Sequence, residues 1–213
     1  MELKGKIINF LGDSITEGVG ASKSENKYVS VFERLTGAKA NNYGISATRI
    51  AHQHVSTHGI VDTQAFTERF MDMSDDADAV VVFGGTNDFG HGDAPIGSFT
   101  DRTNGTFYGA CHVLFEGLVK KYLGKPIVIM TPLHRRNELD PKENNGAVFK
   151  TYVDIIREVA EYYSLYVLDL YATSGLQPAI PEVKVNYMPD GLHPNDKGHA
   201  VLAYRVAKFL ENI

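Results

Sequence analysis

The chain has 213 residues, of which 43% are hydrophobic and 22% are charged, and this is enough for one domain with a substantial core. Its formal net charge is −5, and the only short basic cluster is His134, Arg135 and Arg136. Because binding to phosphates needs a basic patch, this balance argues against nucleic acid as the main partner. We expect a single domain over residues 1–213.

A single cysteine, Cys111, excludes an intramolecular disulfide bond. The apolar run near the N-terminus is too short for a signal peptide and lacks a cleavage site of small residues. No stretch approaches the roughly 18 apolar residues that a membrane-spanning helix needs. These features predict a cytoplasmic protein without a membrane span, and they leave open whether it forms a homo-oligomer.

Short apolar runs alternate with longer amphipathic stretches along the chain. The runs are rich in Val and Ile and predict strands at 6–12, 77–85, 125–132 and 165–171, and residues 39–44 are a weaker strand candidate. Apolar residues at helical spacing predict helices at 28–37, 63–71, 107–123, 146–164 and 195–213. Because strands and helices alternate without an internal repeat, the pattern predicts an α/β fold with a parallel sheet covered on both faces.

In such a sheet, the loops at the carboxyl ends of the strands carry the functional site. Ser14 follows the first expected strand and Gly44 ends the second. Asn87 follows the third, and Asp190 and His193 share a short loop before the last helix. We therefore expect these residues to meet at one edge of the sheet.

The chemistry of these residue types fits a nucleophilic serine. A serine hydroxyl needs a base, which His193 can supply, and Asp190 can orient the imidazole and stabilise its charged form. The attacked carbonyl becomes an oxyanion, for which the N–H groups of Ser14 and Gly44 and the side-chain amide of Asn87 are candidate donors. The sequence therefore predicts a nucleophilic serine that attacks a carbonyl group.

Taken singly, these residues have ordinary structural interpretations. Ser14 alone would be a turn or N-cap residue, and Asp190 with His193 could form a simple helix-entry turn. Asp13 is expected to hold the nucleophile loop through side-chain to backbone hydrogen bonds, and Asp88 to brace the loop of Asn87. It is their occurrence together, at the expected strand ends, that favours catalysis.

Four short blocks of the sequence resemble the signature blocks of the SGNH, or GDSL-type, hydrolases. They are Gly-Asp-Ser at 12–14, Gly44, Gly-Thr-Asn-Asp at 85–88 and Asp-Gly-Leu-His at 190–193. The resemblance implies a three-layer α/β/α, flavodoxin-like fold with a five-stranded parallel sheet. It also implies esterase or acylhydrolase activity without a metal or another cofactor. One departure is Ile15, where the name motif has Leu.

The segment at 90–105 is long and rich in turn residues. Because it follows the Asn87 block, we expect it to overhang the cleft and to shape the pocket for the acyl or alcohol group. Phe89, Phe99 and Phe107 are candidate walls of that pocket. The alternative is a simple surface excursion.

Two other groups of residues invite a functional interpretation. His134 and Arg135 follow the fourth strand and are candidates for contacts with a polar or anionic group of the substrate, with a solvated surface as the alternative. His52, His54 and His58 lack an acidic or cysteine partner at a convincing spacing, so we predict no metal site.

The substrate expected first is an ester of a small acyl group, such as acetyl, on a carbohydrate or a similar polar alcohol. A thioesterase or lysophospholipase is the alternative, and it would need a long apolar groove. A non-catalytic ligand-binding module on the same fold would be expected to have a broken triad.

A nucleotide- or flavin-binding protein is disfavoured because residues 18–23 lack the third glycine of the dinucleotide fingerprint. The absence of a G-x-S-x-G elbow disfavours the α/β-hydrolase fold.

Overall fold

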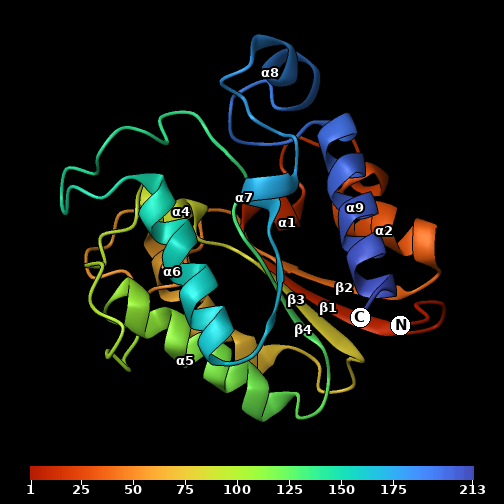
Figure 1. The fold of residues 1–213 in the computed structure, drawn as a ribbon, viewed down its shortest axis with the longest axis horizontal. Coiled ribbons are helices and arrows are strands. Elements are labelled where there is room, and N and C mark those ends of the chain that lie inside the picture. Colours follow the sequence, from red (N-terminus) through yellow and green to blue (C-terminus); the bar gives the residue numbers. More distant parts are fainter.

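The computed structural model of the protein describes all 213 residues and contains a five-stranded parallel sheet (Figure 1). The strands follow the spatial order β2-β1-β3-β4-β5, which is the order of flavodoxin-like folds. Their bounds are β1 Ile7–Gly12, β2 Lys39–Gly44, β3 Ala79–Phe83, β4 Ile127–Met130 and β5 Tyr166–Leu168. Gly12 pairs with both Gly44 and Phe83, so the carboxyl ends of the first three strands lie side by side. The predicted fold class is confirmed.

Helices cover both faces of the sheet, because alternate residues of the buried strands point to opposite sides. Val81 faces one apolar core with the helices α2 and α9, whereas Val80 and Val82 face the other with α3, α5 and α6 (Figure 1). The bounds of these helices are α2 Tyr28–Thr36, α3 Phe66–Arg69, α5 Phe107–Lys121, α6 Phe149–Tyr162 and α9 Asp196–Glu211.

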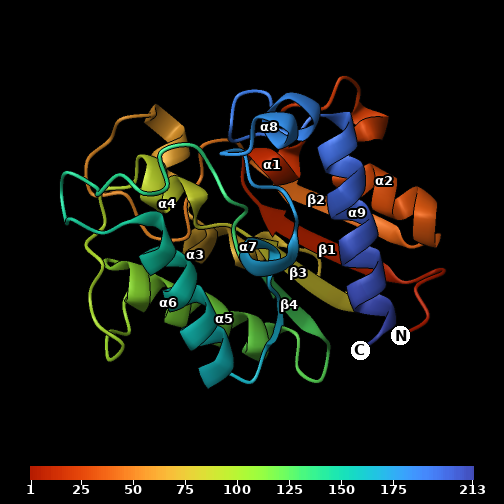
Figure 2. The ribbon, with the colours of Figure 1, turned by 45° about the horizontal axis from the view of Figure 1, so that its top comes forward.

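Four short α-helices and three 3₁₀ turns complete the chain. The helix α8 contacts α9 and lies on the side of the molecule where the strands end (Figure 2). The bounds are α1 Ser14–Glu17, α4 Thr86–Gly90, α7 Leu170–Thr173, α8 Pro181–Tyr187, η1 Ser24–Asn26, η2 Gly59–Thr63 and η3 Phe70–Asp72. No helix combines the length and the apolar character that crossing a membrane would require.

Most predicted elements extend past the observed ones, and two are less than half their expected length in the structure. The helix expected at 63–71 is reduced to the four residues of α3, flanked by 3₁₀ turns, because so short a segment gains little from helix propagation. The strand expected at 165–171 ends at Leu168. The side chain of Asp169 then accepts the backbone N–H of Ala172 and begins α7.

Candidate active site

The nucleophile candidate Ser14 begins α1 directly after β1. The carboxylate of Asp13 accepts the backbone N–H of Ile15 at 3.0 Å and so caps this helix, which confirms its expected hydrogen bond. A side chain at Gly12 would place its Cβ 1.9 Å from the Oγ1 atom of Thr16, so only glycine allows the tight turn from strand to helix. Ser14 is mostly buried, and its own N–H lies in the first turn, where helices leave their N–H groups unpaired.

Ser14, His193 and Asp190 form a continuous hydrogen-bonded chain. The Oγ atom of Ser14 lies 3.0 Å from Nε2 of His193, and Nδ1 of His193 lies 2.7 Å from Oδ2 of Asp190. An ionised Asp190 accepts the N–H at Nδ1, so Nε2 carries the free lone pair that can accept the serine proton. The structure therefore brings together the three residues that the sequence nominated.

The carboxylate of Asp190 is held in its ionised form. Partial burial would raise its pKa, but hydrogen bonds from the His193 ring and from the backbone N–H groups of His193 and Leu192 outweigh this and lower the pKa below its usual range. Arg136 fixes the same loop from outside, because its backbone N–H donates to Gly191 and its Nη1 donates to the carbonyl of Asp190. Asp190 can thus orient and balance an imidazolium at neutral pH.

Asn87 lies in α4, at the carboxyl end of β3, and its side chain is nearly buried. Its Nδ2 donates to the carbonyl of Thr48 at 3.0 Å, and this leaves one N–H of the amide for another acceptor. The neighbouring Asp88 accepts the backbone N–H groups of Ile50 and Ala51 at 3.0 and 2.9 Å. Asp88 therefore braces the loop of Asn87 against the loop that follows β2, as expected.

Gly44 does not fit the role of an oxyanion donor, and this expectation was wrong. Its N–H donates to Oδ1 of Asn42 at 2.8 Å and is not available. A Cβ at Gly44 would lie 2.1 Å from the backbone nitrogen of Glu17, so the glycine is needed for the close approach of α1 to β2.

The backbone N–H of Ala47 is a candidate donor that the sequence did not reveal. Ala47 has a φ of 64°, and its N–H has no acceptor within the protein. The preceding Ser46 N–H is held by Glu17 of α1, and the following Thr48 carbonyl is held by Asn87. Ala47 therefore sits between the nucleophile helix and the Asn87 loop. Alanine is not typical of this left-handed conformation, so the sequence carries no signal for it.

Burial gives Asp13 an unusual ionisation. Burial, opposed by the hydrogen bond from Ile15, raises the pKa of Asp13 to about 7, and the nearby carboxylate of Asp88 adds to this. The positive charges of Arg69 and Arg135 act to lower the pKa of Asp13. Asp13 is thus largely protonated at slightly acidic pH, and the turn before Ser14 then carries little negative charge.

His134 and Arg135, the expected substrate contacts, both make contacts within the protein. The Nδ1 atom of His134 lies 2.9 Å from the carboxylate of Glu138. The Nη1 atom of Arg135 donates to the carbonyl and to the hydroxyl of Thr86 at 2.6 and 3.0 Å, and its guanidinium lies 5.3 Å from the centre of the Phe89 ring. Arg135 therefore braces α4, which carries Asn87.

The aromatic residues near the segment 90–105 mostly belong to the core. Phe107 is fully buried and Phe89 is nearly so, but Phe89 also borders a cavity of about 470 Å³ together with Gly90, so its place in a pocket wall stays a prediction. Phe99 packs against His112 of α5, with ring centres 5.1 Å apart. The sequence could not separate these roles, because a core and a pocket wall both require apolar side chains.

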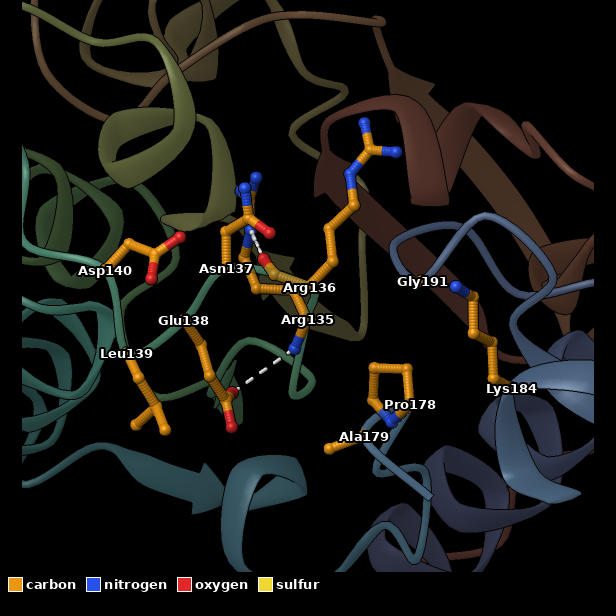
Figure 3. Close-up of a pocket in the computed structure, with 10 residues that line it drawn as sticks. All are labelled: Arg135, Arg136, Asn137, Glu138, Leu139, Asp140, Pro178, Ala179, Lys184 and Gly191. Carbon is orange, nitrogen blue, oxygen red and sulfur yellow. Dashed lines mark hydrogen bonds between the residues drawn. The ribbon is translucent and has the colours of Figure 1, made fainter. Parts of the chain in front are cut away.

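A cavity of about 370 Å³ lies beside the loop of Asp190 and His193 (Figure 3). Five of its ten lining residues are charged, and they come from the loop after β4 and from α8; the loop before α8 and the turn of the triad loop complete the wall. Figure 3 shows the lining residues Arg135, Arg136, Asn137, Glu138, Leu139, Asp140, Pro178, Ala179, Lys184 and Gly191.

The three histidines at 52–58 do not converge on one point. Nδ1 of His52 lies 2.6 Å from the carboxylate of Glu68, and Nε2 of His54 lies 2.9 Å from the carbonyl of Gly105. No group of three or more His, Cys, Asp or Glu side chains in the structure is arranged to hold a metal ion.

The chain is similar to several solved structures over nearly its full length. A protein from Lactobacillus plantarum shares 30% identity over 99% of this chain and 98% of its own, with a TM-score of 0.83. The lipase/acylhydrolase from Enterococcus faecalis shares 20% identity over 97% and 96% of the two chains, with a TM-score of 0.66. A structure described as the acetyl xylan esterase AlAXEase shares 21% identity over 96% and 99%, with a TM-score of 0.64.

No curated protein matches the chain. The matching family model covers residues 10–201, and with it most of the sheet and the whole candidate site. In agreement with the resemblance noted from the four sequence blocks, the chain belongs to the GDSL-like lipase/acylhydrolase family.

Proposed function

We propose that the protein is a serine esterase in which Ser14 attacks the ester carbonyl, His193 transfers the proton and Asp190 orients the imidazole. The observation that carries this proposal is the continuous hydrogen-bonded chain from the Ser14 hydroxyl through both ring nitrogens of His193 to Asp190. Membership of a lipase/acylhydrolase family supports the reaction class.

The reaction proceeds in two steps. In the first, Nε2 of His193 takes the hydroxyl proton while Oγ of Ser14 bonds to the carbonyl carbon, and the alcohol then leaves with that proton. In the second, His193 takes a proton from water, the resulting hydroxide attacks the acyl-enzyme, and Ser14 regains its proton as the acid leaves. Each step passes through a tetrahedral oxyanion that needs donors already in place.

Three donors are available for that oxyanion. They are the N–H of Ser14 at the start of α1, the N–H of Ala47 and the remaining amide N–H of Asn87. The unpaired N–H of Ala47 and the half-used amide of Asn87 support this assignment. The partial positive charge at the N-terminus of α1, a helix of one turn, also stabilises the oxyanion.

The substrate that fits best is a short acyl ester, such as an acetate, of a carbohydrate or another polar alcohol. The charged residues that line the cavity beside the proposed triad support a polar alcohol. The cavity lined by Asp13 and Ile15, the neighbours of the nucleophile, has only about 10 Å³, room for about one water molecule. A thioesterase or lysophospholipase would need an apolar groove for a long acyl chain, which neither cavity provides.

The test is the rate of hydrolysis of p-nitrophenyl acetate, butyrate and octanoate and of a peracetylated sugar. We expect the acetate esters to react fastest and the octanoate slowest. Ser14→Ala should abolish all turnover, whereas Ser30→Ala on α2 serves as the control and should keep it. A preference for octanoate would overturn the short-acyl assignment, and a folded protein inactive on every ester would favour a binding module.

A further inference from the structure

Arg69, the last residue of α3, joins the segments that carry the proposed oxyanion donors. Its Nη2 donates to the carbonyl of Gly12 at 2.6 Å and to the hydroxyl of Thr48 at 3.0 Å. Its Nη1 donates to the carbonyl of Tyr43, and its Nε donates to the carbonyl of Gln64 at 3.0 Å. One guanidinium therefore holds the end of β1, the end of β2 and the turn that follows β2.

All of these acceptors are neutral, and none is a carboxylate. Burial lowers the pKa of Arg69 to about 10, and the charge of Asp13 opposes this change. Arg69 therefore remains charged at neutral pH, with its guanidinium 4.8 Å from the centre of the Phe66 ring. A cation that is largely removed from water and has no ion pair costs free energy of folding. The presence of such a cation beside Ser14 therefore suggests a role in the reaction.

Two of the contacts of Arg69 lie next to segments that carry the proposed donors. The Gly12 carbonyl belongs to the turn that leads into Ser14, and Thr48 directly follows Ala47. The Thr48 carbonyl in turn accepts the amide of Asn87. A shift of the Arg69 side chain would therefore move the segments of all three donors relative to one another.

We propose that Arg69 is a positioning residue for the oxyanion donors and that its partly buried positive charge favours the negative charge that develops on the substrate oxygen. The inference rests on the proposed esterase function. A purely structural clamp would make the same contacts, but its loss would lower stability without a selective effect on the transition state. Interactions that strengthen in the transition state change kcat, whereas uniform binding changes KM.

The experiment compares Arg69→Met and Arg69→Lys with Arg157→Met. Arg157 is a matched control, because it is also partly buried and stacks on an aromatic ring, 5.7 Å from the centre of Tyr171, although it has ion pairs with carboxylates. For each variant we would measure thermal unfolding, kcat and KM for p-nitrophenyl acetate, and the Kd of a phenylboronic acid. The boronic acid forms a tetrahedral adduct with a reactive serine.

For Arg69→Met we expect kcat to fall about 100-fold with little change in KM, and the boronic acid to bind more weakly by a similar factor. Arg69→Lys should be intermediate, because it keeps the charge but not the fork of donors. Arg157→Met should lose stability and keep its kcat. In Arg69→Ala, millimolar guanidinium should restore part of the lost kcat.

Three results would overturn the inference: an unchanged kcat in folded Arg69→Met, a loss expressed in KM alone, or unchanged binding of the boronic acid. If Arg69→Met does not fold, Arg69→Lys decides in the same way, and its full wild-type kcat would refute the role. Failure of the proposed function looks different, because the wild-type protein itself would then hydrolyse no ester.

Discussion

The buried carboxyl group of Asp13 should impose a pH dependence on stability that Asp13→Asn removes. Burial raises the pKa of Asp13 from 3.8 to about 7 in the folded protein. The difference is about 3 pH units, and at 1.36 kcal/mol per unit it corresponds to about 4 kcal/mol. Because the folded state binds the proton more tightly, this contribution is fully present below pH 4, is lost as the pH rises towards 7 and is absent at higher pH.

Asparagine resembles the protonated carboxyl group and can still accept the N–H of Ile15. The free energy of unfolding of Asp13→Asn, measured by urea denaturation, should therefore rise relative to the wild type by up to about 4 kcal/mol between pH 4 and pH 8. Asp72→Asn replaces an exposed carboxylate and should show no such trend. A constant difference between Asp13→Asn and the wild type across this range would refute the reasoning.

Three substitutions at the oxyanion loops test the assignment of donors. Gly44→Ala should prevent the packing of α1 on β2, because its Cβ would lie 2.1 Å from the Glu17 nitrogen. Thermal unfolding would detect the loss of stability, and a fully stable variant would contradict the structure. Ala47→Gly keeps the N–H and suits the φ of 64°, so ester turnover should persist, and its loss would count against Ala47 as a backbone donor. Asn87→Ala should lower kcat by about 100- to 1,000-fold with a smaller effect on KM, and a rise in KM alone would exclude the role.

The sequence predicted the sheet well because buried parallel strands are continuous apolar runs. The segments of β3 and β4 consist almost entirely of such residues, and both faces of these strands are covered. The helix α8 gave no comparable signal, because none of its seven residues is buried and no apolar periodicity results. Short helices at strand ends depend on caps and tertiary contacts that a hydrophobic pattern does not encode.

The hydrogen-bonded cluster of Ser14, Asp190 and His193 could be expected from the sequence, because few other arrangements require these residue types at these spacings. The candidate oxyanion donors were harder to predict from the sequence, because a backbone N–H belongs to every residue except proline. Gly44 was selected for its missing side chain, and the structure shows that packing against α1 is the reason for it. The proposed role of Ala47 rests only on its φ angle and its unpaired N–H, and both depend on contacts distant in the sequence.

The most direct test of the central claim is covalent labelling by a fluorophosphonate followed by mass spectrometry of the peptides. Such a reagent reacts with a serine whose hydroxyl is activated by a base and whose oxyanion is stabilised. We expect a single phosphonyl group on Ser14, no label in Ser14→Ala and much slower labelling in His193→Ala. Labelling of a different serine, or equal rates in the wild type and His193→Ala, would contradict the assignment of Ser14 and His193 as nucleophile and base.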